Sequence, residues 1–384
     1  MGREFITPAM ILTGRGCLAD AGGHLAGLGK KALVVCGQSA VRHGSVARLG
    51  EMLAAQDIAF DVYDGVTDEP TDVMVFEGLD KFRAGRCDFL VALGGGSPID
   101  AMKGIAMMHV CRGRIADYMG IPIDAPLPRM VAIPTTAGTG SEVTKICIIT
   151  DTGSGVKMLL AGGAFMPTIA IVDPDLGRTV PAKVSISAGL DALTHAIEAY
   201  TSKKAQPLSD TLALSAIRRI FASLRRVLQD GDDMDAREQM SLAALEAGMA
   251  FSNSSVTLVH GMSRPIGALF HVPHGLSNAM LLHACLNFAV EGCRERFAVM
   301  GRLVGVVGGD VSEDVAAAAF LDALNGLRRA CAVPTLAEYG IPGDSFFAQI
   351  DKMADDAIAS GSIDNTRRPM NRDAVKALYR EAYQ

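Results

Sequence analysis

Apolar, β-branched runs that end abruptly in glycine, serine or threonine recur through the first half of the chain. They span residues 30–37, 87–97, 128–138 and 168–176, and amphipathic helical patterns such as that at 45–56 lie between several of them. This alternation is the signature of βαβ units around a mainly parallel sheet. The run at 144–161 is different, because glycine and serine in its middle predict an antiparallel hairpin.

The pattern changes after Pro181. Strand-like runs fade, and long helical segments rich in alanine, leucine and methionine follow one another. A chain of 384 residues also exceeds the usual size of a single hydrophobic core. We therefore predict an α/β domain over residues 1–180 and an all-helical domain over residues 181–384.

Composition narrows the classes of partner. The chain is 49% hydrophobic and 20% charged, its net charge is −6, and it has no Lys/Arg-rich run. These values favour a globular protein that binds neither nucleic acid nor a membrane surface. No apolar run approaches the roughly 20 residues that span a bilayer, and no secretory signal pattern is present. The eight cysteines form no CxxC pair, which predicts reduced thiols and a cytoplasmic location.

The loop GGGSPID at 94–100 follows a predicted buried strand. Three glycines let the backbone turn sharply and approach a ligand without obstruction by side chains. Ser97 suits the N-cap of a following helix, and Asp100 would complete an S-x-x-D capping box. Backbone amides at such a helix start form a ready site for a pyrophosphate. A well-capped turn without any ligand explains the same residues.

A second polar loop, PTTAGTGSE at 134–142, follows the next predicted strand. It offers the hydroxyl groups of Thr135, Thr136, Thr139 and Ser141. In open α/β sheets, ligands bind beyond the carboxyl ends of the strands, where both loops would lie. Two such loops in succession favour a nucleotide site over a pair of structural turns.

The segment GLDALTHAIEAY at 189–200 has helical periodicity in its apolar residues. Asp191 and His195 lie one turn apart and project, with Glu198, from the opposite side. A solvated helix face accounts for this pattern. A pair of metal ligands also does, since an i, i+4 pair can bind one cation.

The segment HGMSRPIGALFHVPHG at 260–275 holds three of the eight histidines, which are His260, His271 and His274. One carboxylate and three imidazoles make a suitable ligand set for a divalent transition metal. These segments contain no cysteine, which argues against a structural thiolate zinc site.

The motifs at 94–106, 134–144, 189–200 and 260–275 resemble those of the iron-containing, or group III, alcohol dehydrogenases. That family is related to lactaldehyde reductase, glycerol dehydrogenase and dehydroquinate synthase, and the resemblance covers essentially the whole chain. It implies a Rossmann-like α/β N-terminal domain, an all-α C-terminal domain and an active site in the cleft between them. Transferred position by position, the metal ligands fall on Asp191, His195, His260 and His274.

The resemblance implies a metal-dependent oxidoreductase that interconverts a small alcohol and its aldehyde or ketone by hydride transfer with NAD or NADP. The cation would polarise the substrate carbonyl. Iron (Fe²⁺) is the family expectation, although zinc (Zn²⁺), manganese or nickel could occupy the same ligands. Relatives lead us to expect a homodimer or a larger homo-oligomer. The predicted cofactor-binding residues are Gly37, Ser39, Gly94, Gly95, Gly96, Ser97, Asp100, Thr135, Thr136, Thr139, Ser141 and Lys157.

Two positions depart from the family pattern. Many relatives carry a histidine four residues after the third ligand, where this chain has Arg264. We predict a catalytic role for Arg264, in binding an anionic substrate, or a salt bridge at the domain interface. His271 remains as a second candidate catalytic group, near the metal or in a proton relay. NAD-preferring relatives carry an aspartate after the second strand, where Gly37 stands here, and this change predicts tolerance of the NADP 2′-phosphate.

Three other functions fit parts of the pattern. A hydroxyacid–oxoacid transhydrogenase is a narrower relative, and a dehydroquinate-synthase-like lyase shares the architecture while using its nicotinamide only transiently. A catalytically silent scaffold would be expected to have lost metal ligands, but all four positions are filled. The intact ligand set also disfavours a maleylacetate reductase.

Overall fold

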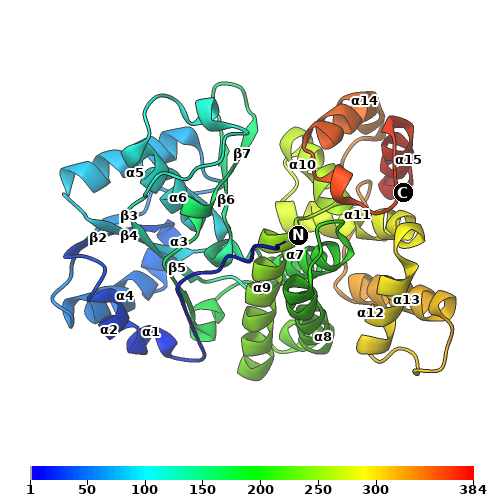
Figure 1. The fold of residues 1–384 in the computed structure, drawn as a ribbon, viewed down its shortest axis with the longest axis horizontal. Coiled ribbons are helices and arrows are strands. Elements are labelled where there is room, and N and C mark those ends of the chain that lie inside the picture. Colours follow the sequence, from blue (N-terminus) through cyan, green and yellow to red (C-terminus); the bar gives the residue numbers. More distant parts are fainter. Residues whose placement is uncertain (1) are drawn as a thin grey trace. The chain divides into compact units, whose positions relative to one another are not determined.

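The structure is a computed structural model that describes residues 2–384. These residues form two compact units (Figure 1). One unit is Ile6–Val180, and the other is Pro181–Gln384 together with residues 2–5. The first unit is α/β and the second is helical, as the sequence predicts.

The α/β unit is built on a six-stranded parallel sheet with the strand order β1-β8-β5-β4-β2-β3. The strands are β1 (Met10–Thr13), β2 (Lys31–Cys36), β3 (Ala59–Tyr63), β4 (Phe89–Gly94), β5 (Arg129–Pro134) and β8 (Ile169–Val172). The four apolar runs of the sequence form β2, β4, β5 and β8, which confirms their prediction as strands. The edge strands β1 and β3 are only partly buried, so their sequences lack a continuous apolar run.

Helices cover both faces of this sheet. Alternate side chains of β2 show the division, because Leu33 and Val35 pack into one core while Val34 and Cys36 pack into the other. The first core contains α5 (Asp72–Ala84), α6 (Gly96–Val110) and the antiparallel hairpin of β6 (Ile146–Thr150) and β7 (Lys157–Ala161). The second contains α1 (Cys17–Asp20), α2 (Gly22–Leu25) and α4 (Ser45–Ala54).

The strand order contains a switch point. Strand β2 pairs with β3 on one side and with β4 on the other, so the chain changes direction between β2 and β4. Ligands of open α/β sheets bind outside the carboxyl ends of the strands at such a point. Gly37, which precedes α3 (Gln38–Arg42), follows β2, and Gly94 ends β4. Gly37 and the first predicted cofactor loop therefore flank the switch point, and the second loop follows the neighbouring strand β5.

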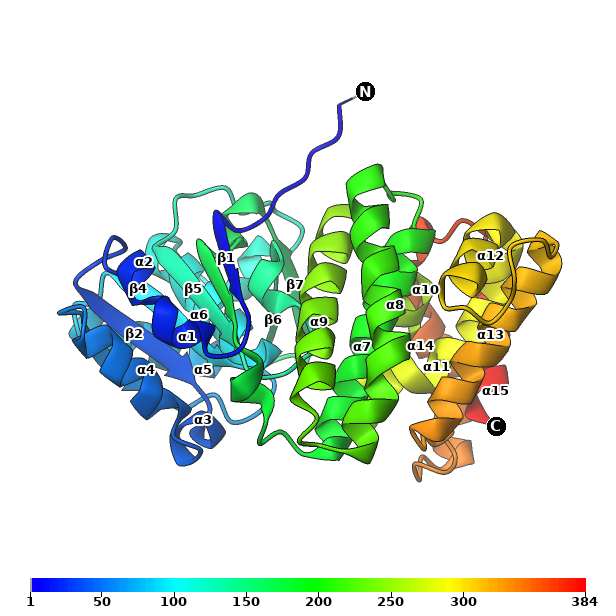
Figure 2. The same cartoon turned by 90° about the horizontal axis from the view of Figure 1, so that it is seen from below.

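The second unit is helical. It contains no β-strand within residues 181–384. Helices α7, α8 and α9 lie side by side in it (Figure 2). Its helices are α7 (Ala182–Thr201), α8 (Pro207–Gln229), α9 (Met234–Ser254), α10 (Leu258–Phe270), α11 (His274–Ala289), α12 (Arg294–Leu303), α13 (Glu313–Ala330), α14 (Gly343–Ala359) and α15 (Arg372–Tyr383).

Short 3-10 helices connect several elements. They are η1 (Ile115–Tyr118), η2 (Ser141–Val143), η3 (Gly163–Phe165), η4 (Pro174–Gly177), η5 (Val290–Gly292) and η6 (Ile363–Asn365). No helix within residues 2–384 has the length and apolar character needed to cross a membrane.

Candidate metal centre and cofactor loops

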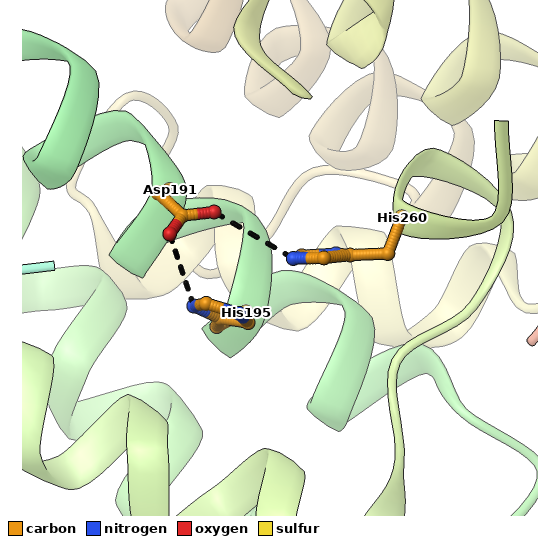
Figure 3. Close-up of side chains that lie close together, drawn as sticks. All are labelled: Asp191, His195 and His260. Atoms are coloured by element: carbon orange, nitrogen blue, oxygen red, sulfur yellow. Dashed lines mark ion pairs between the residues drawn. The ribbon is translucent and has the colours of Figure 1, made fainter. Parts of the chain in front are cut away.

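Asp191 and His195 of α7 face His260 of α10 in the helical unit (Figure 3). The Nδ1 atom of His195 lies 3.9 Å from Oδ2 of Asp191, and Nε2 of His260 lies 3.6 Å from Oδ1. One ligand atom from each residue lies within 4.8 Å of the others, and all three residues are buried. The solvated-face interpretation of this helix is therefore wrong, since α7 is buried on every side from Gly189 to Thr201.

His274, the first residue of α11, joins this cluster. Its Nε2 lies 3.8 Å from Oδ1 of Asp191, and its ring centroid lies 5.3 Å from that of His260. Ligands about 2.1 Å from a tetrahedral ion stand about 3.4 Å apart. The separations from the two Asp191 oxygens, 3.6–3.9 Å, are 0.2–0.5 Å longer than that value. The carboxylate and the three imidazoles are therefore candidate ligands of one divalent ion.

Two glycines allow α10 and α11, the helices that carry His260 and His274, to lie close to neighbouring residues. Gly261 and Gly275 each follow a histidine of the cluster. A Cβ on Gly261 would stand 2.7 Å from Cγ1 of Ile363, and one on Gly275 would stand 2.5 Å from the carbonyl oxygen of Ser187. The two glycines therefore leave no room for a side chain beside two of the candidate ligands, His260 and His274.

The charges in the cluster support each other. Burial opposes ionisation of Asp191, but the neighbouring His195 and His274 and the hydrogen bond with His260 outweigh it and lower the pKa of Asp191. Burial likewise opposes the charged form of His260, and Glu198 outweighs that effect and raises the pKa of His260. Asp191 is thus held as a carboxylate, the form that binds a cation.

Asn278 is a cluster residue that the sequence analysis missed. Its Nδ2 lies 2.7 Å from Oδ1 of Asp191, 3.1 Å from Nε2 of His260 and 3.4 Å from Nε2 of His274. Among residues 2–384, its buried Oδ1 has no hydrogen-bond partner. A half-turn of the amide would direct this oxygen, which attracts divalent cations, towards the ligand atoms. Its position four residues after His274 on one helix was the available signal.

Three further residues lie near the cluster, either in space or along the sequence. The ring of Phe251 on α9 stacks on His195 with centroids 4.1 Å apart. His271 is exposed at the end of α10 with a left-handed φ of 54°. Arg264, one turn after His260, donates from Nη1 to Oγ of Ser362 at 3.2 Å. Burial lowers the pKa of Arg264, and nearby Glu198 partly opposes this effect.

The first glycine loop leads into α6 differently from the prediction. The helix begins at Gly96, its N-cap is Gly95, and this N-cap has no side chain to cap the amides. The predicted capping box of Ser97 and Asp100 is therefore wrong. Asp100 instead accepts hydrogen bonds from Oγ of Ser141 at 2.6 Å and from the amide of Ile148 at 3.1 Å. The first-turn amides of α6 are left available for a ligand.

The two predicted loops lie against each other. The amide of Thr135 donates to the carbonyl of Gly94 at 2.9 Å. A Cβ on Gly95 would stand 3.3 Å from Oγ1 of Thr136, and one on Gly96 would stand 3.0 Å from Cγ2 of Thr139. The glycines thus face the threonines of the second loop at the carboxyl edge of the sheet.

A buried lysine, not predicted, ties the loops together. Lys103 of α6 is fully buried, and its Nζ donates to the carbonyls of Ser141 at 2.8 Å, Thr144 at 3.0 Å and Ile146 at 2.8 Å. Ser141 is itself buried between Lys103 and Asp100. Asp100 and Ser141 therefore hold the shape of the loop through internal contacts.

The remaining predicted cofactor residues are spread over the α/β unit. Gly37 is the N-cap of α3, and a Cβ there would stand 2.7 Å from the carbonyl oxygen of Val66. Ser39 is exposed on α3 and contacts His43. Lys157 begins β7, where its Nζ lies 2.7 Å from Glu69.

A doubly wound parallel sheet with glycine loops suits a nucleotide cofactor, and the buried Asp–His cluster of the helical unit suits a divalent metal. This combination is typical of a metal-dependent oxidoreductase that uses a nucleotide cofactor. The sequence profile described as iron-containing alcohol dehydrogenase matches residues 8–174. The profile of the Fe-containing alcohol dehydrogenase family, C-terminal, matches residues 185–383. The chain belongs to the iron-containing alcohol dehydrogenase family.

Several relatives are similar over nearly the full length. The chain is 37% identical to 1,3-propanediol dehydrogenase of Klebsiella pneumoniae, over 92% of each sequence. It is 37% identical to the NAD-dependent methanol dehydrogenase of Bacillus methanolicus, over 89% of this chain and 90% of that protein. It is 34% identical to the NADPH-dependent butanol dehydrogenase of Clostridium saccharobutylicum, over 99% and 98%.

A solved structure agrees with this assignment. The crystal structure of a 1,3-propanediol oxidoreductase superposes with a TM-score of 0.96 at 35% identity, covering 100% of both chains. Members of the family interconvert alcohols and aldehydes, so the chain is an enzyme of the alcohol dehydrogenase class.

Proposed function

We propose that this enzyme interconverts a small alcohol and its carbonyl compound with NAD or NADP, and that Asp191, His195, His260 and His274 bind its divalent ion. The observation that carries the proposal is the buried cluster in which three ligand atoms lie within 4.8 Å of each other. Fe²⁺ is the first choice because of the family, and Zn²⁺ suits the same donors.

A divalent ion at this cluster supplies Lewis acidity that polarises a carbonyl or makes an alcohol more acidic. Asp191 contributes the negative charge that attracts the ion, and the three imidazoles contribute neutral nitrogen donors. Phe251 covers one face of His195 and limits access of water to that ring. His271 and Arg264 are the candidate groups for handling a proton and for contacting an anionic substrate.

The glycine and threonine loops are proposed to bind the nucleotide. The amides at the start of α6 suit the pyrophosphate, and Gly94, Gly95 and Gly96 leave room for it. Gly37 places no carboxylate at the end of β2, so nothing at that position repels a 2′-phosphate. The relatives named above include one NAD-dependent and one NADPH-dependent enzyme, which supports use of both cofactors.

The decisive test is a substrate panel on the purified enzyme with metal analysis of the same preparation. Short alcohols, diols, hydroxyacids and their aldehydes are assayed with NAD and with NADP. We expect net reduction of free cofactor by at least one alcohol, and a divalent metal bound per chain. Turnover without net change in free cofactor would contradict the proposal and point to a lyase or a transhydrogenase.

We further propose a cytoplasmic homo-oligomer. All eight cysteines are free, and seven of them are buried, which suits a reducing compartment. The sheet has two edge strands, β1 and β3, each paired with another strand on one side only, and such edges can pair with a second copy. Light scattering on the purified protein measures the oligomeric state directly.

A further inference from the structure

Glu198 is a buried carboxylate on α7 whose two oxygens both contact the beginning of α10. Its Oε1 accepts hydrogen bonds from Oγ1 of Thr257 at 2.8 Å and from the amide of Val259 at 2.6 Å. Its Oε2 lies 2.6 Å from Nδ1 of His260. The side chain is completely buried, so no water competes for these contacts.

The contact with His260 fixes which ring nitrogen can bind a metal. A carboxylate can only accept hydrogen bonds, so Nδ1 of His260 must donate to it. The other nitrogen, Nε2, then lies on the side of Asp191, 3.6 Å from its Oδ1. In metalloproteins a carboxylate behind a histidine fixes the tautomer and the ring orientation, and makes the ligand more basic.

The same carboxylate also sets the position of α10. The N-cap residue Thr257 makes no side-chain cap, and Glu198 from α7 satisfies the first-turn amide of Val259 in its place. A negative charge is favourable at a helix N-terminus. Glu198 therefore holds the helix that carries His260 as well as the imidazole itself.

We propose that Glu198 is a positioning residue of the metal centre, which orients His260 so that Nε2 binds the ion. This inference rests on the proposed metal site and adds to it a residue that touches neither the ion nor the substrate. The alternative is that Glu198 only caps the buried N-terminus of α10 and does not affect metal binding.

Glu198→Gln discriminates between these two roles because it keeps the size of the side chain. An amide has one acceptor oxygen, and two donors, Thr257 and Val259, already converge on the position of Oε1. With its oxygen there, the amide NH₂ faces Nδ1 of His260, which must then accept. The ring proton moves to Nε2, the atom needed for the metal.

Thr257→Val is the matched control. It removes one hydrogen bond to the same carboxylate but leaves the contact between Glu198 and His260. Glu198→Asp is a second variant that keeps the charge and shortens its reach. Each purified full-length protein is stripped of metal, its thermal stability is recorded, and its Zn²⁺ affinity is measured by competition with a chromophoric chelator.

We expect Glu198→Gln to weaken Zn²⁺ binding about 10- to 100-fold, Glu198→Asp to weaken it less, and Thr257→Val to change it less than about threefold. Thr257→Val should instead lower the thermal stability of the metal-free protein. Wild-type affinity in Glu198→Gln, or equal losses in Glu198→Gln and Thr257→Val, would overturn the inference. If Glu198→Gln does not fold, wild-type affinity in Glu198→Asp would overturn it.

Failure of this inference can be separated from failure of the proposed function. A wild-type protein that binds Zn²⁺ and reduces free cofactor, together with an unaffected Glu198→Gln variant, contradicts only the role of Glu198. A wild-type protein that binds no divalent ion contradicts the metal site itself, and the role of Glu198 with it.

Discussion

The imidazole of His274 and the carboxylate of Asp191 approach to 3.8 Å, from the first residue of α11 and the middle of α7. The side chain of His274 is 36% exposed, whereas that of Asp191 is 3% exposed. Asp191 is also within 4 Å of His195 and His260, so it is the residue that all three histidines share. The exposed member of such a cluster can be removed with the least damage to the fold.

His274→Ala should therefore lose most bound metal and most activity while remaining folded. We expect the metal affinity to fall by more than the roughly 10- to 100-fold typical of losing an outer hydrogen-bond partner. Metal content by mass spectrometry and circular dichroism check the two parts. His271→Ala removes an exposed imidazole three residues away and should keep its metal. Full occupancy and normal turnover in His274→Ala would refute the ligand assignment.

Gly96→Val should weaken nucleotide binding and leave metal binding unchanged. Its Cβ would stand 3.0 Å from Cγ2 and 3.2 Å from Oγ1 of Thr139, and it would cover the amides at the start of α6. We expect cofactor affinity by calorimetry to fall at least about tenfold, or about 1.4 kcal/mol. Adding Thr139→Ala relieves the contact between the loops but also removes a hydroxyl that accepts from the amide of Ser141, so Thr139→Ala alone is the control for this double variant. If that double variant regains normal affinity, the glycine is needed for loop packing and not for the phosphate.

The wild-type enzyme should use both NAD and NADP, since Gly37 leaves the end of β2 uncharged. Gly37→Asp should shift the ratio of kcat/KM towards NAD by repelling the 2′-phosphate. A Cβ at this position also meets the carbonyl oxygen of Val66 at 2.7 Å, so Gly37→Ala is the necessary control. An equal loss with both cofactors in both variants would show a backbone effect alone. Rejection of NADP by the wild type would also contradict this interpretation.

Local sequence patterns predict the strands whose successive residues are nearly all buried. Strands β2, β4, β5 and β8 were predictable because parallel strands covered on both faces read as apolar stretches. The edge strand β3 has a partly exposed, mixed sequence and gave no such signal. Ser97 resembles an N-cap and so predicts a later start of α6, but the helix begins at Gly96 with Gly95 as its N-cap.

In the candidate site, too, some residues could be predicted from the sequence and others could not. Asp191, His195, His260 and His274 were found through spacing and family motifs, and the structure brings them together around Asp191. Glu198 was read as part of a helix face, and Asn278 and Lys103 were overlooked. Most of their partners are far along the chain, as with Lys103 and Ile146, so local patterns do not reveal those contacts. The exception is Asn278, whose spacing of four residues from His274 is a local signal.

Glu142 should make the stability of the enzyme depend on pH. It is 2% exposed, and burial raises the pKa of its carboxyl from 4.5 to about 7. Between these values the folded protein binds more protons than the unfolded chain, so stability falls as pH rises through this window. The full effect is on the order of 3 kcal/mol.

Urea unfolding at about pH 5 and about pH 8 tests this prediction. The free energy of unfolding should fall less between these pH values for Glu142→Gln than for the wild type. Glu51→Gln, at an exposed position of α4, is the control and should behave as the wild type. An identical pH dependence in Glu142→Gln would contradict the prediction.

Arg264 carries the most specific prediction about the substrate. It lies one turn after His260 on α10, and among residues 2–384 its guanidinium forms no ion pair with a carboxylate. Its hydrogen bond to Ser362 engages Nη1 alone, which leaves other N–H groups for a substrate. A guanidinium beside the metal centre favours a substrate with a carboxylate, which it can bind through two parallel hydrogen bonds.

Arg264→Met should therefore reduce kcat/KM for hydroxyacids or acid semialdehydes at least about tenfold more than for neutral alcohols, which corresponds to about 1.4 kcal/mol of selective binding. Metal content should not change, because Arg264 is not among the ligands. Ser362→Ala removes the observed hydrogen-bond partner of Arg264 and tests for a structural role. Since it leaves the charge in place, it should affect anionic and neutral substrates equally. A uniform loss across both substrate classes in Arg264→Met would mean that the arginine serves only to support α10, and the anion-binding role would then be abandoned.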